Sequence, residues 1–171
     1  MLRRRVLSTA VAVPVLAGLG GTPAAHANPP AGPTYDIKAL TPQQIDELLN
    51  GRGTGRARAA ELNSYPGPMH VLELHTDLRL DAHQQRVAEE LVAWMRPQAI
   101  RLGRQILDIE QQLDRAFRAG TARQSEVHRL TARAAELEGR LRAVHLESHR
   151  RMRAALTAEQ IDRYNELRGH E

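Results

Sequence analysis

The fold is decided by residues 81–120, DAHQQRVAEELVAWMRPQAIRLGRQILDIEQQLDRAFRAG. Apolar residues recur there at steps of three and four, which places them on one helix face: Val87, Leu91, Trp94, Met95, Leu102, Ile106, Ile109, Leu113 and Phe117. Asp81 suits the helix start, so we predict one long helix from Asp81 to about Ala119. Pro97 should kink this helix, because proline has no N–H to donate to the carbonyl of Ala93.

A second long helix is predicted to begin at Ser125. Its stripe keeps the same steps and resembles a coiled-coil seam: Val127, Leu130, Ala134, Leu137, Leu141, Val144, Ser148 and Met152. Two such helices joined by a short glycine-containing turn should form an antiparallel hairpin. One apolar stripe per helix leaves surface to cover, so we expect the short helices to fold back and the chain to form a homodimer.

Shorter helices should flank this hairpin. Thr41 and Pro42 are suited to cap and begin one helix, and Tyr65-Pro66-Gly67-Pro68 should break the chain between two others. The predicted short helices cover residues 42–50, 56–62, 69–78 and 158–167, the last one capped by Thr157. The predicted fold class is therefore all-α, a long antiparallel helical hairpin with short flanking helices in a dimer.

Composition narrows the class of protein further. The chain has 171 residues, only 3% of them aromatic, and no cysteine. Few aromatic residues disfavour a β-sandwich or barrel, and the length suits one domain plus an export segment. Without cysteine, the chain has no disulfide, no thiolate metal site and no cysteine nucleophile.

Residues 1–27 have the three parts of a signal peptide. Arg3, Arg4 and Arg5 are followed by an uncharged apolar run from Val6 to Gly20, and Ala25-His26-Ala27 is a suitable cleavage site. The run is shorter than the roughly 20 residues of a membrane-spanning helix. We expect cleavage after Ala27 and a periplasmic location; an uncleaved membrane anchor is the alternative.

The mature chain should divide into a linker at residues 28–39, an N-terminal short-helix segment at 40–68 and the helical hairpin domain at 69–169. Loss of residues 1–27 removes three arginines and no acidic residue, so the net charge falls from +4 to +1. Electrostatic binding to phosphates needs a concentrated basic excess. We therefore expect no nucleic-acid partner.

The sequence Leu-Thr-x-x-Gln occurs at residues 40–44 and 156–160, and a variant with Asp in place of Thr occurs at 80–84. Each copy is a capping-box-like helix start. Together with the signal peptide and the two long helices, these motifs resemble the periplasmic Spy/CpxP-like family. Residues 61–74 and 156–164 are similar to its subgroup of heavy-metal resistance proteins and periplasmic heavy-metal sensors. The resemblance implies a helical envelope protein that binds metal or acts as a chaperone.

His145 and His149 lie four residues apart in the second long helix. This spacing puts both imidazoles on one helix face, where they suit joint ligation of a divalent ion. The alternative is a pair of partly exposed residues beside the apolar seam. His83 and His128 should lie on exposed faces without a role.

The resemblance implies further ligands before and within the first long helix. It points to His70, beside Met69, and to a carboxylate from Glu89 or Glu90. The complete predicted ligand set is His70, Glu89, Glu90, His145 and His149. Imidazole and carboxylate suit zinc, copper, nickel or cobalt, and nothing indicates an organic cofactor.

The predicted function is a periplasmic metal-binding protein of the heavy-metal or envelope stress response, which senses or buffers a divalent transition metal. Lys38 is the only lysine among 24 basic residues. A surface that mixes arginine with apolar side chains suits an ATP-independent holdase for unfolded exported proteins, which is the first alternative. The second is a coiled-coil adaptor of a membrane signalling protein. No phosphate-binding loop, G-x-S-x-G or H-E-x-x-H motif is present, so an enzyme is not expected.

Overall fold

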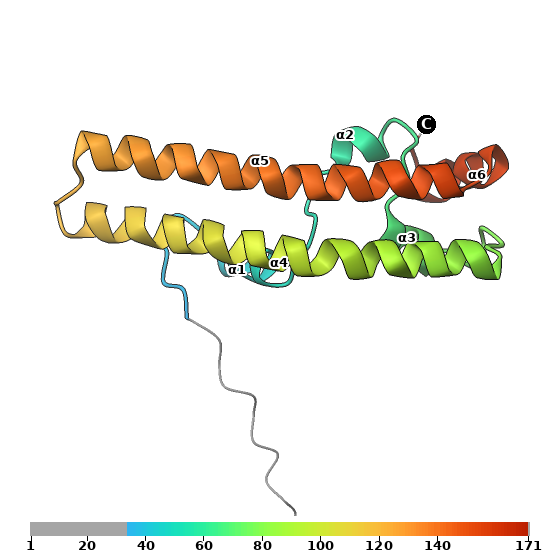
Figure 1. Cartoon of the computed structure of the whole chain (residues 1–171), viewed down its shortest axis with the longest axis horizontal. Coiled ribbons are helices and arrows are strands. Elements are labelled where there is room, and N and C mark those ends of the chain that lie inside the picture. Colours follow the sequence, from blue (N-terminus) through green and yellow to red (C-terminus); the bar gives the residue numbers. More distant parts are fainter. Residues whose placement is uncertain (1–33, 171) are drawn as a thin grey trace, which may run out of the picture. The chain divides into compact units, whose positions relative to one another are not determined.

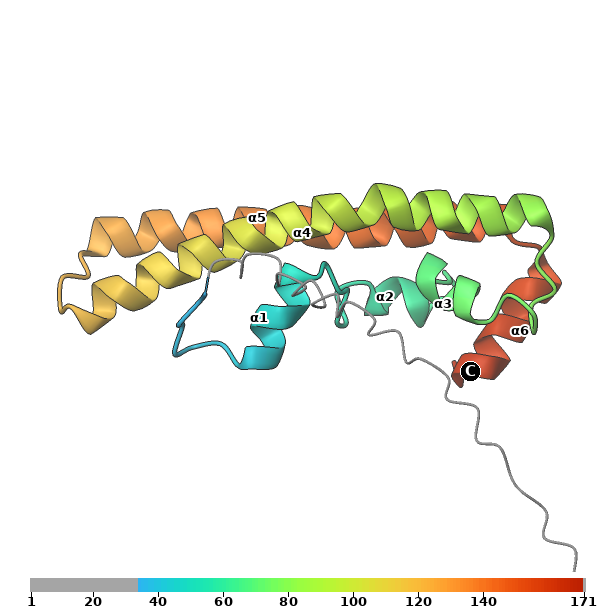
Figure 2. The same cartoon turned by 90° about the horizontal axis from the view of Figure 1, so that it is seen from below.

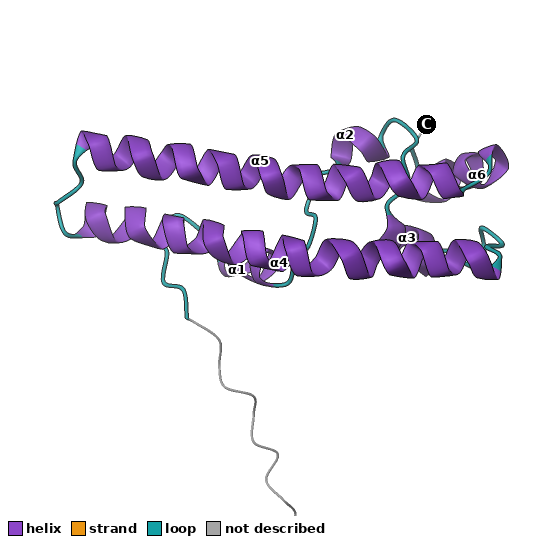
Figure 3. Cartoon of the chain, in the orientation of Figure 1, coloured by secondary structure: helices purple, strands orange, loops and turns teal. Residues whose placement is uncertain are grey.

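Residues 34–170 of the chain are described by a computed structural model, and they contain six α-helices and no strand (Figure 3). The helices are α1 (Pro42–Leu49), α2 (Arg58–Glu61), α3 (Pro68–Glu73), α4 (Ala82–Arg118), α5 (Gln124–Ala155) and α6 (Ala158–Arg168). The predicted all-α class is confirmed. The predicted signal peptide, residues 1–27, lies outside the described residues. Between residues 34 and 170, no helix combines the length and apolar character needed to cross a bilayer.

The two long helices, α4 and α5, lie side by side and are joined by residues 119–123 (Figures 1 and 2). Leu102 and Leu107 of α4 pack with Leu137 and Leu141 of α5 in one buried cluster. At the other end, the amide of Gln84 in α4 donates to the carbonyl of Ala155 at 3.0 Å. Much of the two predicted apolar stripes thus forms a shared core, but the prediction was wrong for Trp94 and Phe117, which are 37% and 63% exposed.

The short helices cover this pair, as expected. Val71 of α3, Leu91 of α4, Met152 of α5 and Tyr164 of α6 are at most 2% exposed and form a second buried cluster. Burial of side chains of this size stabilises the fold by about 1.5–3 kcal/mol each. α6 and α3 are therefore held against the ends of the long helices by apolar packing.

All three Leu-Thr-x-x-Gln copies form complete capping boxes. The side chains of Thr41, Asp81 and Thr157 each accept from the backbone N–H three residues on, and the glutamine there accepts from the cap's own N–H. Asp81 thus replaces threonine without loss of the cap, and the start of α4 is confirmed. Each such cap contributes about 1 kcal/mol.

One glycine lets α1 approach α4 closely. A Cβ on Gly103 would lie 2.2 Å from the carbonyl oxygen of Leu48, so no larger residue fits without moving α1. This contact brings Leu48 and Ala99 into the first buried cluster. The loop after α1 is thereby held beside the middle of α4.

Several helix boundaries differ from the sequence prediction, and α2 is shorter than the predicted helix at residues 56–62. α3 ends at Glu73 rather than near Leu78, because the chain reverses before Asp81 and Arg79 adopts a positive φ of 50°. α5 begins at Gln124, one residue early, with no side-chain cap. As predicted, α4 runs through Pro97 as one helix, since its other backbone hydrogen bonds and the packing against α5 hold the helix on both sides. The kink at Pro97 stays a prediction.

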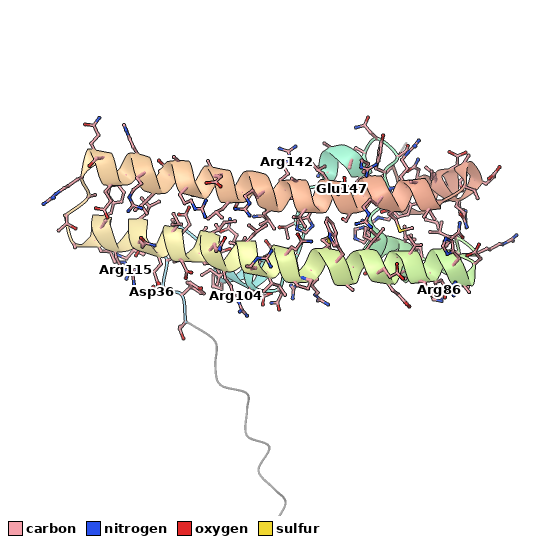
Figure 4. All side chains as sticks on the ribbon, in the orientation of Figure 1. Asp36, Arg86, Arg104, Arg115, Arg142 and Glu147 are labelled. Atoms are coloured by element: carbon pink, nitrogen blue, oxygen red, sulfur yellow. The ribbon has the colours of Figure 1, made fainter. Side chains whose placement is uncertain are left out.

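The end of the predicted linker packs against α4. The Tyr35 hydroxyl donates to Asp108 at 3.0 Å, and Arg118 donates to the Asp36 carboxylate at 2.7 Å. Figure 4 shows Asp36 beside α4. Ile37 is only 4% exposed. The polar contacts are exposed, so the burial of Ile37 is the main physical reason that this segment is ordered.

Candidate metal centre

The three predicted histidine ligands line a single cavity of about 300 Å³. His70 comes from the first turns of α3, and His145 and His149 come from successive turns of α5. His70 lies near the other two histidines because the Pro-Gly-Pro segment separates α2 from α3, and α3 then packs against α5. Three side chains that lie as far as 79 positions apart in the sequence are thus brought to one hollow.

His149 is held in one tautomer. Its Nδ1 lies 2.8 Å from the carbonyl oxygen of Tyr65, and a carbonyl only accepts, so Nδ1 carries the hydrogen. In the neutral ring this leaves Nε2 with a lone pair. A Cβ on Gly67 would lie 3.0 Å from that nitrogen and 2.8 Å from Cε1. Glycine at position 67 therefore gives the ring the space it occupies.

His145 is buried, with 3% of its surface exposed, and its Nε2 has no hydrogen-bond partner. Burial lowers the pKa of His145 to about 4, and the charges of Arg56 and His149 act in the same direction. The ring is therefore neutral near pH 7. An unpaired buried nitrogen costs free energy, and a bound cation would satisfy it.

His149 is also mostly buried, with 8% of its surface exposed. Burial lowers the pKa of His149, and the hydrogen bond to Tyr65 and the nearby Glu61 only partly oppose this effect. The alternative of partly exposed seam residues is therefore wrong for both histidines of α5. Two neutral imidazoles on one helix face are in the protonation state that metal ligation requires.

His70 is oriented by a carboxylate that the sequence analysis did not include. Its Nδ1 lies 3.0 Å from Oε1 of Glu61 and 3.3 Å from the hydroxyl of Tyr164. Tyr164 donates to the same Glu61 oxygen at 2.8 Å, and Arg168 donates to it at 3.4 Å. An imidazole that donates from Nδ1 to a carboxylate presents Nε2 as its ligand atom, a common arrangement around protein metals.

Glu61 remains ionised in this cluster. Its burial raises the pKa, but the hydrogen bond from Tyr164 and the charges of His70 and Arg168 outweigh burial, so the pKa lies below the ordinary value. Burial and the adjacent Glu61 raise the pKa of Tyr164. The tyrosine is therefore a neutral donor to an ionised acceptor at neutral pH.

Glu89 and Glu90 do not join the histidines. Both are exposed, and neither lines the cavity. The reason is helical geometry: Ala88 and Leu91 face the core, so the two residues between them point to the outer side of α4. Of the five predicted ligands, the structure brings together the three histidines and leaves the two glutamates outside.

Sequence reasoning missed Glu61, Tyr164 and the thioether of Met95, which also lines the cavity. Glu61 and Tyr164 fall within the two segments that carry the family resemblance, and that is the only signal that pointed to them. Within residues 34–170, no three His, Asp or Glu side chains already stand close enough to hold one ion. Ligation of one ion by the three histidines would therefore need a rearrangement of their side chains. Searches with family models, among curated proteins and among solved structures found no match to this chain.

Proposed function

We propose that this protein binds a divalent transition metal through His70, His145 and His149 and thereby senses or buffers that metal in the cell envelope. The observation that carries the proposal is the shared cavity: three imidazoles from α3 and α5 line it, and two are fixed at Nδ1 by Tyr65 and Glu61. Fixed tautomers with available Nε2 atoms suit zinc, copper, nickel and cobalt.

The proposal includes the cellular setting expected from the sequence. The chain is exported by residues 1–27 and works in the periplasm as a heavy-metal or envelope stress protein similar to the Spy/CpxP-like family. It forms an antiparallel helical hairpin that pairs as a homodimer. The hydrogen bond from Gln84, near the start of α4, to Ala155, at the end of α5, supports the antiparallel arrangement.

Calorimetric titration tests the metal site directly. Zinc, copper, nickel and cobalt would be added to the purified wild-type chain and to a His145→Ala/His149→Ala variant, with His128→Ala as the control because His128 is exposed on the same helix. We expect micromolar or tighter binding that the double variant loses and the control keeps. Equal binding by all three proteins would disprove the ligand assignment. Circular dichroism of each variant separates lost ligation from lost folding.

A holdase is the second candidate function, and one feature of α4 favours it. A shallow apolar groove of about 920 Å³ is lined by one side of that helix together with Leu72 of α3, and Val92, Pro97 and Ile100 are among its apolar lining residues. Arg96, Arg101 and Arg104 border it, and Figure 4 shows Arg86, Arg104 and Arg115 spaced along α4. Apolar surface edged by arginines suits many weak contacts with unfolded chains.

A light-scattering assay separates the two functions. A holdase should suppress the aggregation of a reduced, unfolding client protein without metal, and Ile100→Asp should weaken this suppression. The His145→Ala/His149→Ala variant should suppress aggregation as well as wild type. Suppression that requires metal and the histidines would assign the activity to the cavity instead of the groove.

A further inference from the structure

Two methionine side chains line the same cavity as the three histidines. Met69 and Met95 both line the histidine cavity, whereas Met152, the other methionine of residues 34–170, is fully buried in the apolar cluster. Met95 is 6% exposed. The chain has only four methionines in all, so the presence of two in one cavity concentrates its sulfur there.

The sulfur of Met95, a residue of α4, contacts α5 between the positions of the two imidazoles. Its Sδ is 3.3 Å from the hydroxyl of Ser148, and Ser148 lies between His145 and His149 in the sequence. The Ser148 hydroxyl donates at 2.7 Å to the carbonyl of His145. The same hydroxyl is also within donor distance of the Met95 sulfur, but a thioether sulfur has two lone pairs, so one is still available to share.

One oxygen of the half-buried carboxylate in this cavity is already shared among several partners. Oε1 of Glu61 already accepts from Tyr164 and Arg168 and contacts His70. The other carboxylate in the lining, Glu73, is exposed. The lining also contains Asn50, Thr54 and the three cationic side chains of Arg52, Arg58 and Arg96. Its other donors are imidazole nitrogens and thioether sulfurs, and soft sulfur ligands select Cu(I).

We propose that this centre selects Cu(I), held by Nε2 of His145 and His149 and by Sδ of Met95, with His70 and Met69 at the more exposed side of the cavity. The proposal rests on the proposed metal-binding function and narrows its ion to monovalent copper. No three His, Asp or Glu side chains of residues 34–170 stand close enough to hold one ion. This ligand set does not need them to, because its third ligand is a thioether. Met69 is 43% exposed, so it is placed to meet an arriving ion first.

Copper-edge X-ray absorption and anaerobic competition titrations test this proposal on the full chain. Cu(I) would be added in competition with a coloured Cu(I) chelator, and Zn(II) would be titrated in parallel. Because the sequence has no cysteine, any sulfur scatterer around copper must be a methionine. We expect such a scatterer in wild type. We also expect Met95→Leu to lose it and to bind Cu(I) at least tenfold more weakly, with Zn(II) binding unchanged.

Met152→Leu is the matched control, since it makes the same exchange of similar volume outside the cavity; it should keep both the scatterer and the affinity. Met69→Leu, at an exposed position, should weaken Cu(I) binding without risk to folding. Copper bound by nitrogen and oxygen alone would overturn the Cu(I) proposal. A third outcome is that Zn(II) binds tightly and is lost in His145→Ala/His149→Ala, while Met95→Leu does not change Cu(I) binding. This outcome would overturn the Cu(I) proposal but support the metal centre. Absence of binding for both ions would overturn both proposals.

Discussion

Gln84 and Gln160 hydrogen-bond each other through both of their side-chain amides. Nε2 of Gln84 donates to Oε1 of Gln160 at 2.7 Å, and Nε2 of Gln160 donates to Oε1 of Gln84 at 2.9 Å. Each oxygen also accepts from its own helix cap, Asp81 or Thr157, and each nitrogen reaches one further carbonyl, of Ala155 or Leu78. Two copies of the repeated motif therefore fasten the starts of α4 and α6 to each other.

This pairing predicts that Gln84→Ala and Gln160→Ala each lower the free energy of unfolding by about 2 kcal/mol, because each removes a cap and leaves the partner amide unsatisfied. Denaturant unfolding measures the effect. Gln44→Ala is the control, because Gln44 caps α1 in the same way but is exposed and has no partner across helices; it should cost about 1 kcal/mol or less. The double variant should cost less than the sum of the single variants. Additive losses would show that the two amides act independently.

Glu61→Gln should weaken metal binding by about 10–100-fold, because an amide no longer fixes His70 through a charged hydrogen bond. Calorimetric titration of wild type and variant measures this change. Glu90→Gln is the matched control, since the same exchange on the outer side of α4 touches no histidine. If the two variants bind metal alike, His70 does not depend on Glu61 for its orientation.

Gly67→Ala should destabilise the chain by about 1–3 kcal/mol and displace the His149 ring, because the new methyl group would lie 2.8 Å from Cε1. Gly139→Ala is the comparison variant. A Cβ there meets nothing within 4 Å, and the position lies inside α5, so alanine should stabilise by about 0.5–1 kcal/mol. Thermal unfolding of both variants provides the measurement, and equal shifts in the same direction would contradict the close contact.

The metal-free protein should lose stability as the pH falls from about 6.5 to about 4. The pKa of His145 is about 4 in the folded chain and ordinarily 6.5. Above 6.5 the ring is neutral in both states and adds no pH dependence. Below 6.5 the unfolded chain takes up the proton first, so the free energy of unfolding falls, by about 3 kcal/mol once the pH is below 4.

Denaturant unfolding at several pH values checks this dependence. His145→Gln should flatten the profile between pH 6.5 and 4, whereas His128→Gln, at an exposed site, should not change it. An unchanged slope in His145→Gln would mean that other groups cause the acid sensitivity.

Local sequence signals were sufficient to predict where three of the helices begin. A capping side chain and the glutamine three residues later act within one turn, so Thr41, Asp81 and Thr157 marked the starts of α1, α4 and α6 before any tertiary contact was known. The steps of three and four also predicted most of the buried residues of α5 and several of α4, but Trp94 and Phe117 of the predicted α4 stripe are exposed and the buried Leu107 was not in it. The end of α3 was missed because it depends on where the chain must turn back to begin α4 at Asp81.

The sequence by itself determined the all-helical class, the starts of three helices and the pairing of His145 with His149 on one face, since these follow from spacing along a single helix. Only the tertiary structure decided that these imidazoles are buried and that Glu61, instead of Glu89 or Glu90, is the carboxylate beside His70. The physical reason is distance along the chain: Glu61 and Tyr164 are 103 positions apart. Their contact forms only when α6 packs against the segment before α3, and no local pattern contains that packing.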